Sequence, residues 1–77
     1  MTRAEFTGEF AEMLNIDPTS LVPETELTSL PEWDSVAYLS TLVLIDDKLS
    51  FPIRPDAIAA ARTFQDILEA VKAALHG

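Results

Sequence analysis

The sequence predicts an all-α fold, a four-helix bundle with a long first loop and a short third helix. Apolar residues recur at helical spacing near both ends of the chain, and a strongly apolar run fills residues 35–49. The prolines fall between these segments, where they separate helices rather than interrupt them. The chain has 77 residues, of which 48% are hydrophobic, so we assign residues 1–77 to one small domain.

The first helix is expected to begin at Thr2. Thr2 and Glu5 form a Thr-x-x-Glu capping box, in which each side chain accepts a hydrogen bond from the backbone amide of the other residue. The helix ends before Pro18, because proline disfavours the helical conformation of Asp17. Its apolar residues share one face, which predicts that they belong to the core: Phe6, Phe10, Met13 and Leu14.

Residues 15–34 read as a long connection that contains three prolines. A structureless loop of this length is unusual in a small domain, so we expect it to lie along the bundle and to be fixed at intervals. A short helical turn is compatible with residues 18–21. The apolar residues that could fix the loop are Ile16, Leu21, Val22, Leu27 and Leu30.

The second helix is predicted over residues 35–49, with Asp34 as its N-cap. Its apolar residues cover a broad arc, which predicts packing against more than one neighbour. Leu44 projects to the opposite side, where it is either an isolated exposed leucine or a contact in a docking surface. The arc consists of Val36, Leu39, Leu42, Val43, Ile45 and Leu49, and the opposite side carries Ala37, Ser40, Thr41, Asp47 and Lys48.

Two more helices are predicted in the last third of the chain. Residues 56–61 fit a short third helix that follows a turn with two prolines. The fourth helix begins after Thr63, which caps it. The acidic side chain of Asp66 stabilises the positive end of the helix dipole at this N-terminus. Lys72 and His76 lie near its end, where they suit the helix dipole. Its apolar positions keep the helical period and predict core residues: Phe64, Ile67, Leu68, Val71 and Leu75.

Composition restricts the partners that the protein can have. The net charge is −8, so nucleic acid and acidic membrane surfaces are disfavoured and partners with basic patches are favoured, although many domains are acidic for solubility alone. Cysteine is absent, so the chain has no disulfide and no thiolate metal site. No apolar run approaches the roughly 20 residues that span a membrane, and the N-terminus lacks the apolar region of a signal peptide. We therefore expect a cytoplasmic protein with no metal site.

Ser35 is the candidate functional residue. A catalytic serine needs a base within hydrogen-bond reach and a third group that orients the base. His76 is the only histidine, it lies near the end of the last predicted helix, and no Gly-x-Ser-x-Gly motif is present. Hydrolase chemistry is therefore not expected. As an attachment point Ser35 is better suited, because a helix N-terminus offers free amides and a positive dipole end to a phosphate group.

The motif Asp34-Ser35-Val36 at the end of a long loop resembles the modification site of the acyl carrier protein family, which has Asp-Ser-Leu. The resemblance covers essentially the whole chain and includes Pro-Glu-Thr-Glu-Leu at residues 23–27 and Thr-Phe-Gln-Asp-Ile at residues 63–67. It implies a 4'-phosphopantetheine arm on Ser35, with Asp34 capping the helix and supporting transfer of the arm. It further implies a non-catalytic carrier, which we expect to be monomeric. Its partners would be a phosphopantetheinyl transferase, an acyl-loading ligase or acyltransferase, and synthase enzymes.

The chain departs from the family pattern beside the motif and along the second helix. Val36 replaces the usual leucine, and Trp33 stands where glycine or alanine is frequent. The row of carboxylates that fatty-acid carriers present on this helix is thinned to Asp46 and Asp47. The thinned row favours a dedicated polyketide or related secondary-metabolite pathway over fatty-acid biosynthesis. The residues expected to dock on partners are Trp33, Val36, Ala37, Ser40, Leu44, Asp46 and Asp47.

Two other functions stay open at this stage. One is an aminoacyl or peptidyl carrier of a nonribosomal peptide pathway, because the loading enzyme largely chooses the cargo. The other is an unmodified acidic helical interaction module, which would not need Ser35. The sequence leaves undecided the identity of the cargo, its position inside or outside the bundle, and the role of Trp33. It also leaves undecided whether the chain is free-standing or a domain excised from a longer protein.

Overall fold

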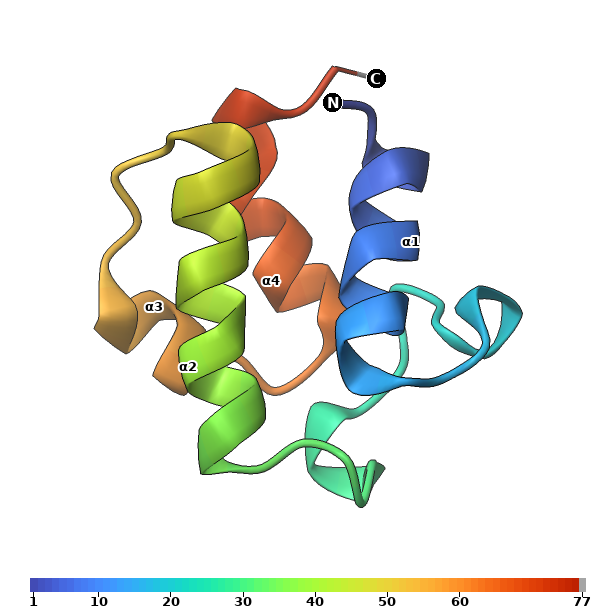
Figure 1. The fold of residues 1–77 in the computed structure, drawn as a ribbon. Coiled ribbons are helices and arrows are strands. Elements are labelled where there is room, and N and C mark those ends of the chain that lie inside the picture. The colour runs from blue at the N-terminus through green and yellow to red at the C-terminus, as the bar shows by residue number, and fades with distance from the viewer. Residues whose placement is uncertain (77) are drawn as a thin grey trace.

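The computed structural model describes residues 1–76, and within this range the chain forms four α-helices and no β-strand (Figure 1). The predicted all-α class is confirmed. A short third helix is also present, because α3 has 5 residues whereas α1 has 12. The helices are α1 (Arg3–Leu14), α2 (Ser35–Leu44), α3 (Pro55–Ala59) and α4 (Phe64–Val71).

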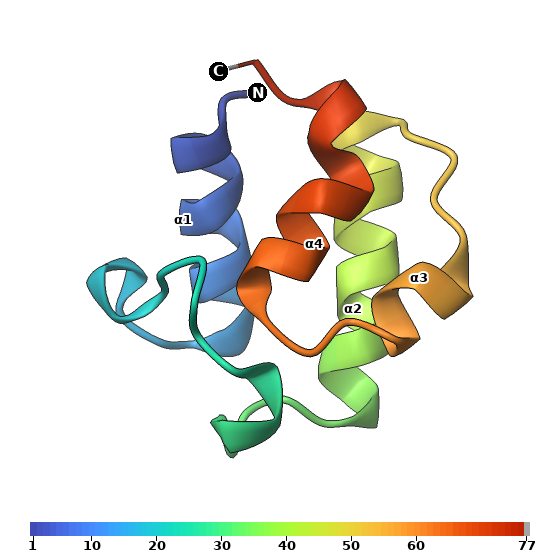
Figure 2. The same cartoon turned by 180° about the vertical axis from the view of Figure 1, so that it is seen from behind.

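All four helices contribute buried residues to the core, and Met1 and His76 lie together on one side of it. Figures 1 and 2 show α4 crossing the space between α1 and α2, with α3 beside the first half of α2. The backbone N–H of His76 donates to the carbonyl of Met1 at 3.0 Å, so the two ends meet. The first turn of α2 lies at the opposite end of the molecule (Figure 1).

The centre of the core is an aromatic cluster. Phe6, Phe10 and Phe64 are each at most 1% exposed, and their ring centroids are 5.1 to 6.4 Å apart. These distances are in the range in which tilted and offset rings attract each other. The helical spacing of Phe6 and Phe10 therefore predicted their burial correctly, and the cluster joins α1 to the start of α4.

The long first connection is fixed to the start of α4. The backbone N–H groups of Phe64 and Gln65 donate to carbonyl groups of the loop, each at 2.9 Å, and Leu27 N–H donates back to the carbonyl of Arg62 at 2.9 Å. Leu27 is completely buried. Because these contacts satisfy part of its backbone, and because Leu21 and Leu27 are buried, the loop needs little regular structure of its own. It contains two short 3₁₀ turns, Pro18–Ser20, where a turn was predicted, and Leu27–Ser29.

The first and fourth helices begin with the expected caps. Thr2 and Glu5 form the capping box of α1, with N–H to oxygen distances of 2.8 and 3.1 Å. At α4, the carboxylate of Asp66 accepts from the N–H groups of Arg62 and Thr63 at 2.9 and 3.2 Å. These hydrogen bonds lower the pKa of Asp66 from its ordinary value of 3.8, chiefly through the amide of Arg62 and then that of Thr63.

The cap of α4 predicts a dependence of stability on pH. The pKa of Asp66 is lower in the folded than in the unfolded chain, so its carboxylate favours folding above pH 3.8. This contribution is lost as the pH falls through the folded pKa. We expect Asp66→Asn to lower the melting temperature by a few degrees at pH 7 and to change it less at pH 3. Glu24→Gln, at an exposed loop position, is the control. Equal effects of the two substitutions at pH 7 would contradict the prediction.

The ends of two helices differ from the prediction. The predicted second helix reaches residue 49, but its last turn, Ile45–Leu49, is π-helical. The fourth helix ends at Val71 and continues only as the 3₁₀ turn Lys72–Ala74, so the prediction that it extends to Leu75 and His76 was wrong. The reason is the extended pairing of His76 with the N-terminal residues. No helix formed by residues 1–76 is long and apolar enough to cross a membrane.

Candidate functional site

Ser35 is the first residue of α2 and is exposed to solvent. The long connection ends directly before it, as the sequence predicted. Figure 1 shows the start of α2 at the end of the molecule opposite the N-terminus, and because Ser35 is exposed there, a large partner can reach it. The structure thus provides an accessible serine at a helix start.

The capping group of α2 is Asp34 and not Ser35. The N–H of Ala37 donates to Oδ1 of Asp34 at 2.8 Å, and the backbone of Asp34 is extended, with φ −133° and ψ −171°. At α1 and α4 the caps are threonines whose hydroxyls accept helix amides. Within residues 1–76 the Ser35 hydroxyl makes no hydrogen bond. Capping therefore does not explain the serine, because its neighbour already provides the cap.

A shallow cavity of about 250 Å³ opens beside Ser35. One wall is Trp33, whose ring lies 5.9 Å from that of Phe10 and is half-buried. The other is Tyr38, whose hydroxyl donates to the carbonyl of Pro55 at 3.3 Å. The complete lining is Trp33, Asp34, Ser35, Tyr38 and Ala59. These residues provide aromatic surface and one carboxylate, and among them no histidine or lysine could act as a base towards Ser35.

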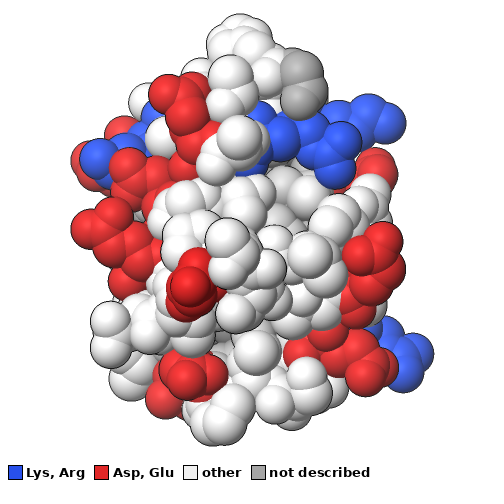
Figure 3. Space-filling model, turned by 90° about the vertical axis from the view of Figure 1, so that its right-hand side faces the viewer, with Lys and Arg blue, Asp and Glu red and all other residues white. Residues whose placement is uncertain are grey.

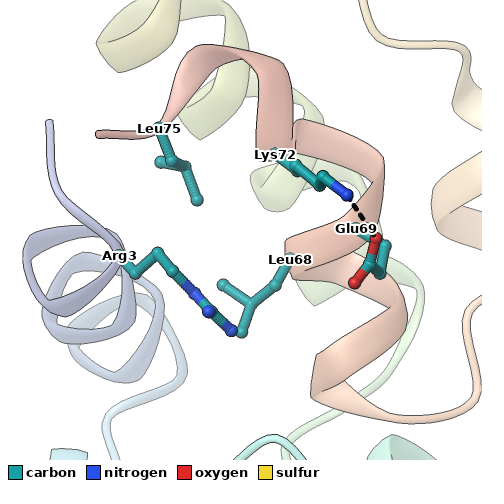
Figure 4. A pocket seen from close by; sticks show the side chains of 5 residues that line it. All are labelled: Arg3, Leu68, Glu69, Lys72 and Leu75. Atoms are coloured by element: carbon teal, nitrogen blue, oxygen red, sulfur yellow. Dashed lines mark ion pairs between the residues drawn. The ribbon is translucent and has the colours of Figure 1, made fainter. Parts of the chain in front are cut away.

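A second cavity, of about 340 Å³, lies between α1 and the end of α4. Figure 4 shows the Arg3 side chain extending towards Leu68, while Lys72 points to Glu69, with 3.8 Å between Nζ and Oε2. Leu75 completes the lining. This cavity contains no serine, threonine or histidine, so it does not complement Ser35. Among residues 1–76, no group of three His, Cys, Asp or Glu side chains could hold a metal ion.

The outward face of α2 differs from the predicted one. Leu39 and Val43 were expected to contribute to the core, but they are 57% and 66% exposed, and Val36, which was expected both in the apolar arc and as a docking residue, is 69% exposed. Ala37, expected on the outer side, is buried, and Leu44 packs against the core, so the predicted exposure of both residues was wrong. Of the other predicted docking residues, Trp33 and Ser40 are half-buried, whereas Asp46 and Asp47 are exposed.

Val36, Leu39 and Val43 form an apolar stripe that begins next to Ser35. They follow the spacing i, i+3 and i+7, so they lie on one side of the helix. Leu39 and Val43 were missed as surface residues, since the same spacing is also the usual signal of a core face. Val22 is the remaining large apolar residue that is strongly exposed in the described chain, and it lies in the first loop.

Acidic side chains dominate the surface around these features. The chain has 13 acidic and 5 basic residues, and on the face that Figure 3 shows, blue side chains lie mainly across the upper part while red ones are spread over both flanks. Carboxylates flank the apolar stripe at both ends, with Asp34 before it and Asp46 and Asp47 after it. A partner that covers the stripe therefore meets negative charge at its rim.

Comparison of the chain with protein-family models, with curated proteins and with solved structures finds no match.

Proposed function

We propose that the protein is an acyl carrier that holds its cargo on a 4'-phosphopantetheine arm attached to Ser35. The observation that supports this proposal is the exposed Ser35 hydroxyl, which makes no hydrogen bond and follows a separate helix cap. A serine in this position has no evident structural task. The all-helical fold, the long fixed loop and the Asp-Ser-Val motif agree with a carrier-type four-helix bundle.

The start of α2 fits a phosphodiester. Within the described residues, the backbone N–H groups of Ser35 and Val36 make no hydrogen bond, since Asp34 occupies only the N–H of Ala37. They point out of the positive end of a 10-residue helix. These amides can therefore interact with phosphate oxygens, and the helix dipole opposes the repulsion from the neighbouring carboxylate.

Attachment requires Ser35 Oγ to act as a nucleophile once, in the active site of an external transferase. Oγ loses its proton to the transferase and forms a bond to the phosphorus that bears the pantetheine group in coenzyme A. The bond from this phosphorus to 3',5'-ADP breaks, and 3',5'-ADP leaves with the electron pair. When bound, the arm supplies a terminal thiol that carries acyl groups as thioesters, which the chain cannot do itself because it has no cysteine.

A carrier assignment explains the absence of catalytic partners around Ser35. A nucleophilic serine needs a neighbouring base, and the side chains around the cavity provide only the carboxylate of Asp34, which already caps α2. We therefore propose that the protein is not an enzyme and that the chemistry takes place on partner enzymes. Asp34 acts through the helix start, which it holds in place beside Ser35 during transfer of the arm.

Mass spectrometry of the intact protein tests this function. The purified protein is incubated with coenzyme A, Mg²⁺ and a phosphopantetheinyl transferase of broad specificity. We expect a single added phosphopantetheine group per chain. A folded protein that stays unmodified with several active transferases would refute the carrier function and leave an acidic interaction module.

The apolar stripe of Val36, Leu39 and Val43 supports partners that make apolar contacts with a basic rim. Exposed apolar side chains in a row mark interaction surfaces. Together with the few carboxylates on α2, the stripe favours a dedicated polyketide or related secondary-metabolite pathway. Binding measurements against synthases of polyketide and of fatty-acid pathways test this part, and tight binding to fatty-acid enzymes alone would overturn it.

The stripe also predicts the effect of a charge at its centre. Leu39 is 57% exposed, so Leu39→Glu should leave the melting temperature nearly unchanged. We expect the rate at which the transferase attaches the arm, measured at low carrier concentration, to fall about tenfold. The reason is that an interface tolerates a buried, unpaired charge poorly. Val22→Glu, at 45% exposure in the first loop, is the matched control and should load normally. The stripe would lose its proposed role if both variants loaded equally well.

A further inference from the structure

We infer that the cavity between Trp33 and Tyr38 is a binding site for the first, branched part of the pantetheine arm. This inference rests on the proposed attachment to Ser35. It assigns a role to Trp33 and a resting position to the arm, which would then lie against the start of α2 instead of moving freely.

The groups of the arm match the cavity in the order in which they follow the Ser35 hydroxyl. Ser35 is itself part of the lining, so any group on its hydroxyl starts at the cavity wall. Directly beyond the phosphate the arm has a methylene group and then a carbon with two methyl groups, which is compact and apolar. The walls offered to these methyl groups are the rings of Trp33 and Tyr38 and the methyl group of Ala59.

The walls are held in place before any arm is attached. Trp33 is half-buried, and its ring lies 5.9 Å from that of the fully buried Phe10 at an angle of 33°. The hydroxyl of Tyr38 donates to the carbonyl of Pro55, the first residue of α3, at 3.3 Å. A cavity with fixed walls loses little conformational freedom when it is filled, which favours binding.

The interior offers the methyl groups no competing site near Ser35. Behind Trp33 the space between α1 and α4 is filled by Phe10, Phe6 and Phe64, all at most 1% exposed. An apolar group on Ser35 can therefore leave water only on the protein surface, where the cavity offers the rings of Trp33 and Tyr38 and the neighbouring helix face offers Val36. The apolar stripe of α2 is separate from the cavity lining, so an arm in this position leaves the stripe free for a partner.

Nuclear magnetic resonance tests the inference through the two methyl groups of the arm. The protein is loaded with coenzyme A that carries ¹³C in these methyl groups, and intact mass establishes that loading is complete. We expect the indole ring to change the chemical shifts of both methyl groups relative to those of the same loaded protein in urea. We also expect nuclear Overhauser effects to the protons of Trp33, which is the only tryptophan.

Two variants separate the cavity from its surroundings. Ala59→Leu narrows the cavity and leaves Trp33 in place, and Ala60→Leu adds the same bulk at a neighbouring exposed position outside the lining. We expect the chemical-shift change and the Overhauser effects to be lost in Ala59→Leu and retained in Ala60→Leu, with both proteins loaded and folded.

Failure of the inference differs from failure of the carrier function. A loaded protein whose methyl signals match those in urea, or an Ala59→Leu variant that keeps the chemical-shift change, refutes the arm site while the attachment stands. Absence of the added mass refutes the carrier function itself.

Discussion

Replacement of Ser35 by alanine is expected to abolish loading completely while the fold is retained. The hydroxyl is the proposed attachment atom, and none of the hydrogen bonds within residues 1–76 involves it. Its removal should therefore change the free energy of unfolding by no more than about 0.5 kcal/mol, which is usual for surface substitutions. Intact mass after incubation with the transferase, together with a thermal melt of the same sample, measures both effects.

A second serine of the same helix provides the control for this substitution. Ser40→Ala removes a hydroxyl from a half-buried position on α2, and this variant should gain one arm as the original protein does. Loading of Ser35→Ala would show that another residue is modified, and the assignment of Ser35 would then be wrong.

Replacement of Phe10 by alanine is expected to have the largest effect on stability. Phe10 is completely buried, and its ring contacts those of Phe6, Phe64 and Trp33 at 6.2, 5.1 and 5.9 Å. Truncation of a buried phenylalanine costs about 3–5 kcal/mol, through lost burial and the cavity that remains. A core of this size provides no more than about 3–5 kcal/mol in total, so much of the variant should be unfolded at 25 °C. Urea denaturation followed by circular dichroism measures the loss.

Phe51 is the matched control, because the same substitution can be made at a half-buried position in the connection between α2 and α3. Phe51→Ala should cost clearly less than Phe10→Ala. Similar losses in the two variants would show that the aromatic cluster is not the main source of stability.

The sequence predicted best those parts of the fold that local interactions determine. The capping boxes at Thr2 and Thr63 involve residues three positions apart, so their pattern contains most of the information needed. The burial of Phe6, Phe10 and Phe64 followed from helical spacing for the same reason. The position of Ser35 at the first turn of α2 was likewise predicted from the cap and the loop before it.

The orientation of α2 could not be predicted, because nearly every position of this helix is apolar or small. Its buried side consists of Ala37 and Thr41 and is continued by Ile45 in the π-helical turn. The phenylalanines of α1 and α4 already fill the core, which leaves space for small side chains opposite them. Thr41 tolerates complete burial since its hydroxyl donates to the carbonyl of Ala37 at 2.8 Å. Periodicity within one helix contains no information about the volume that other helices occupy.

Two features of the candidate site could not be predicted from the motif around Ser35. That the Ser35 hydroxyl makes no hydrogen bond was not visible in the motif, which also suits an ordinary cap. The cavity requires Ala59 of α3 to lie beside Trp33 and Tyr38, which are more than 20 residues away in sequence. Only the packing of α3 against α2 produces this arrangement.

The hydrogen bond between the backbones of His76 and Met1 has a practical consequence for handling the protein. An affinity tag or a surface tether added near either end would extend from the side of the molecule opposite the first turn of α2. Protein immobilised in this way would present Ser35 to the solution, with the same orientation whichever end is chosen.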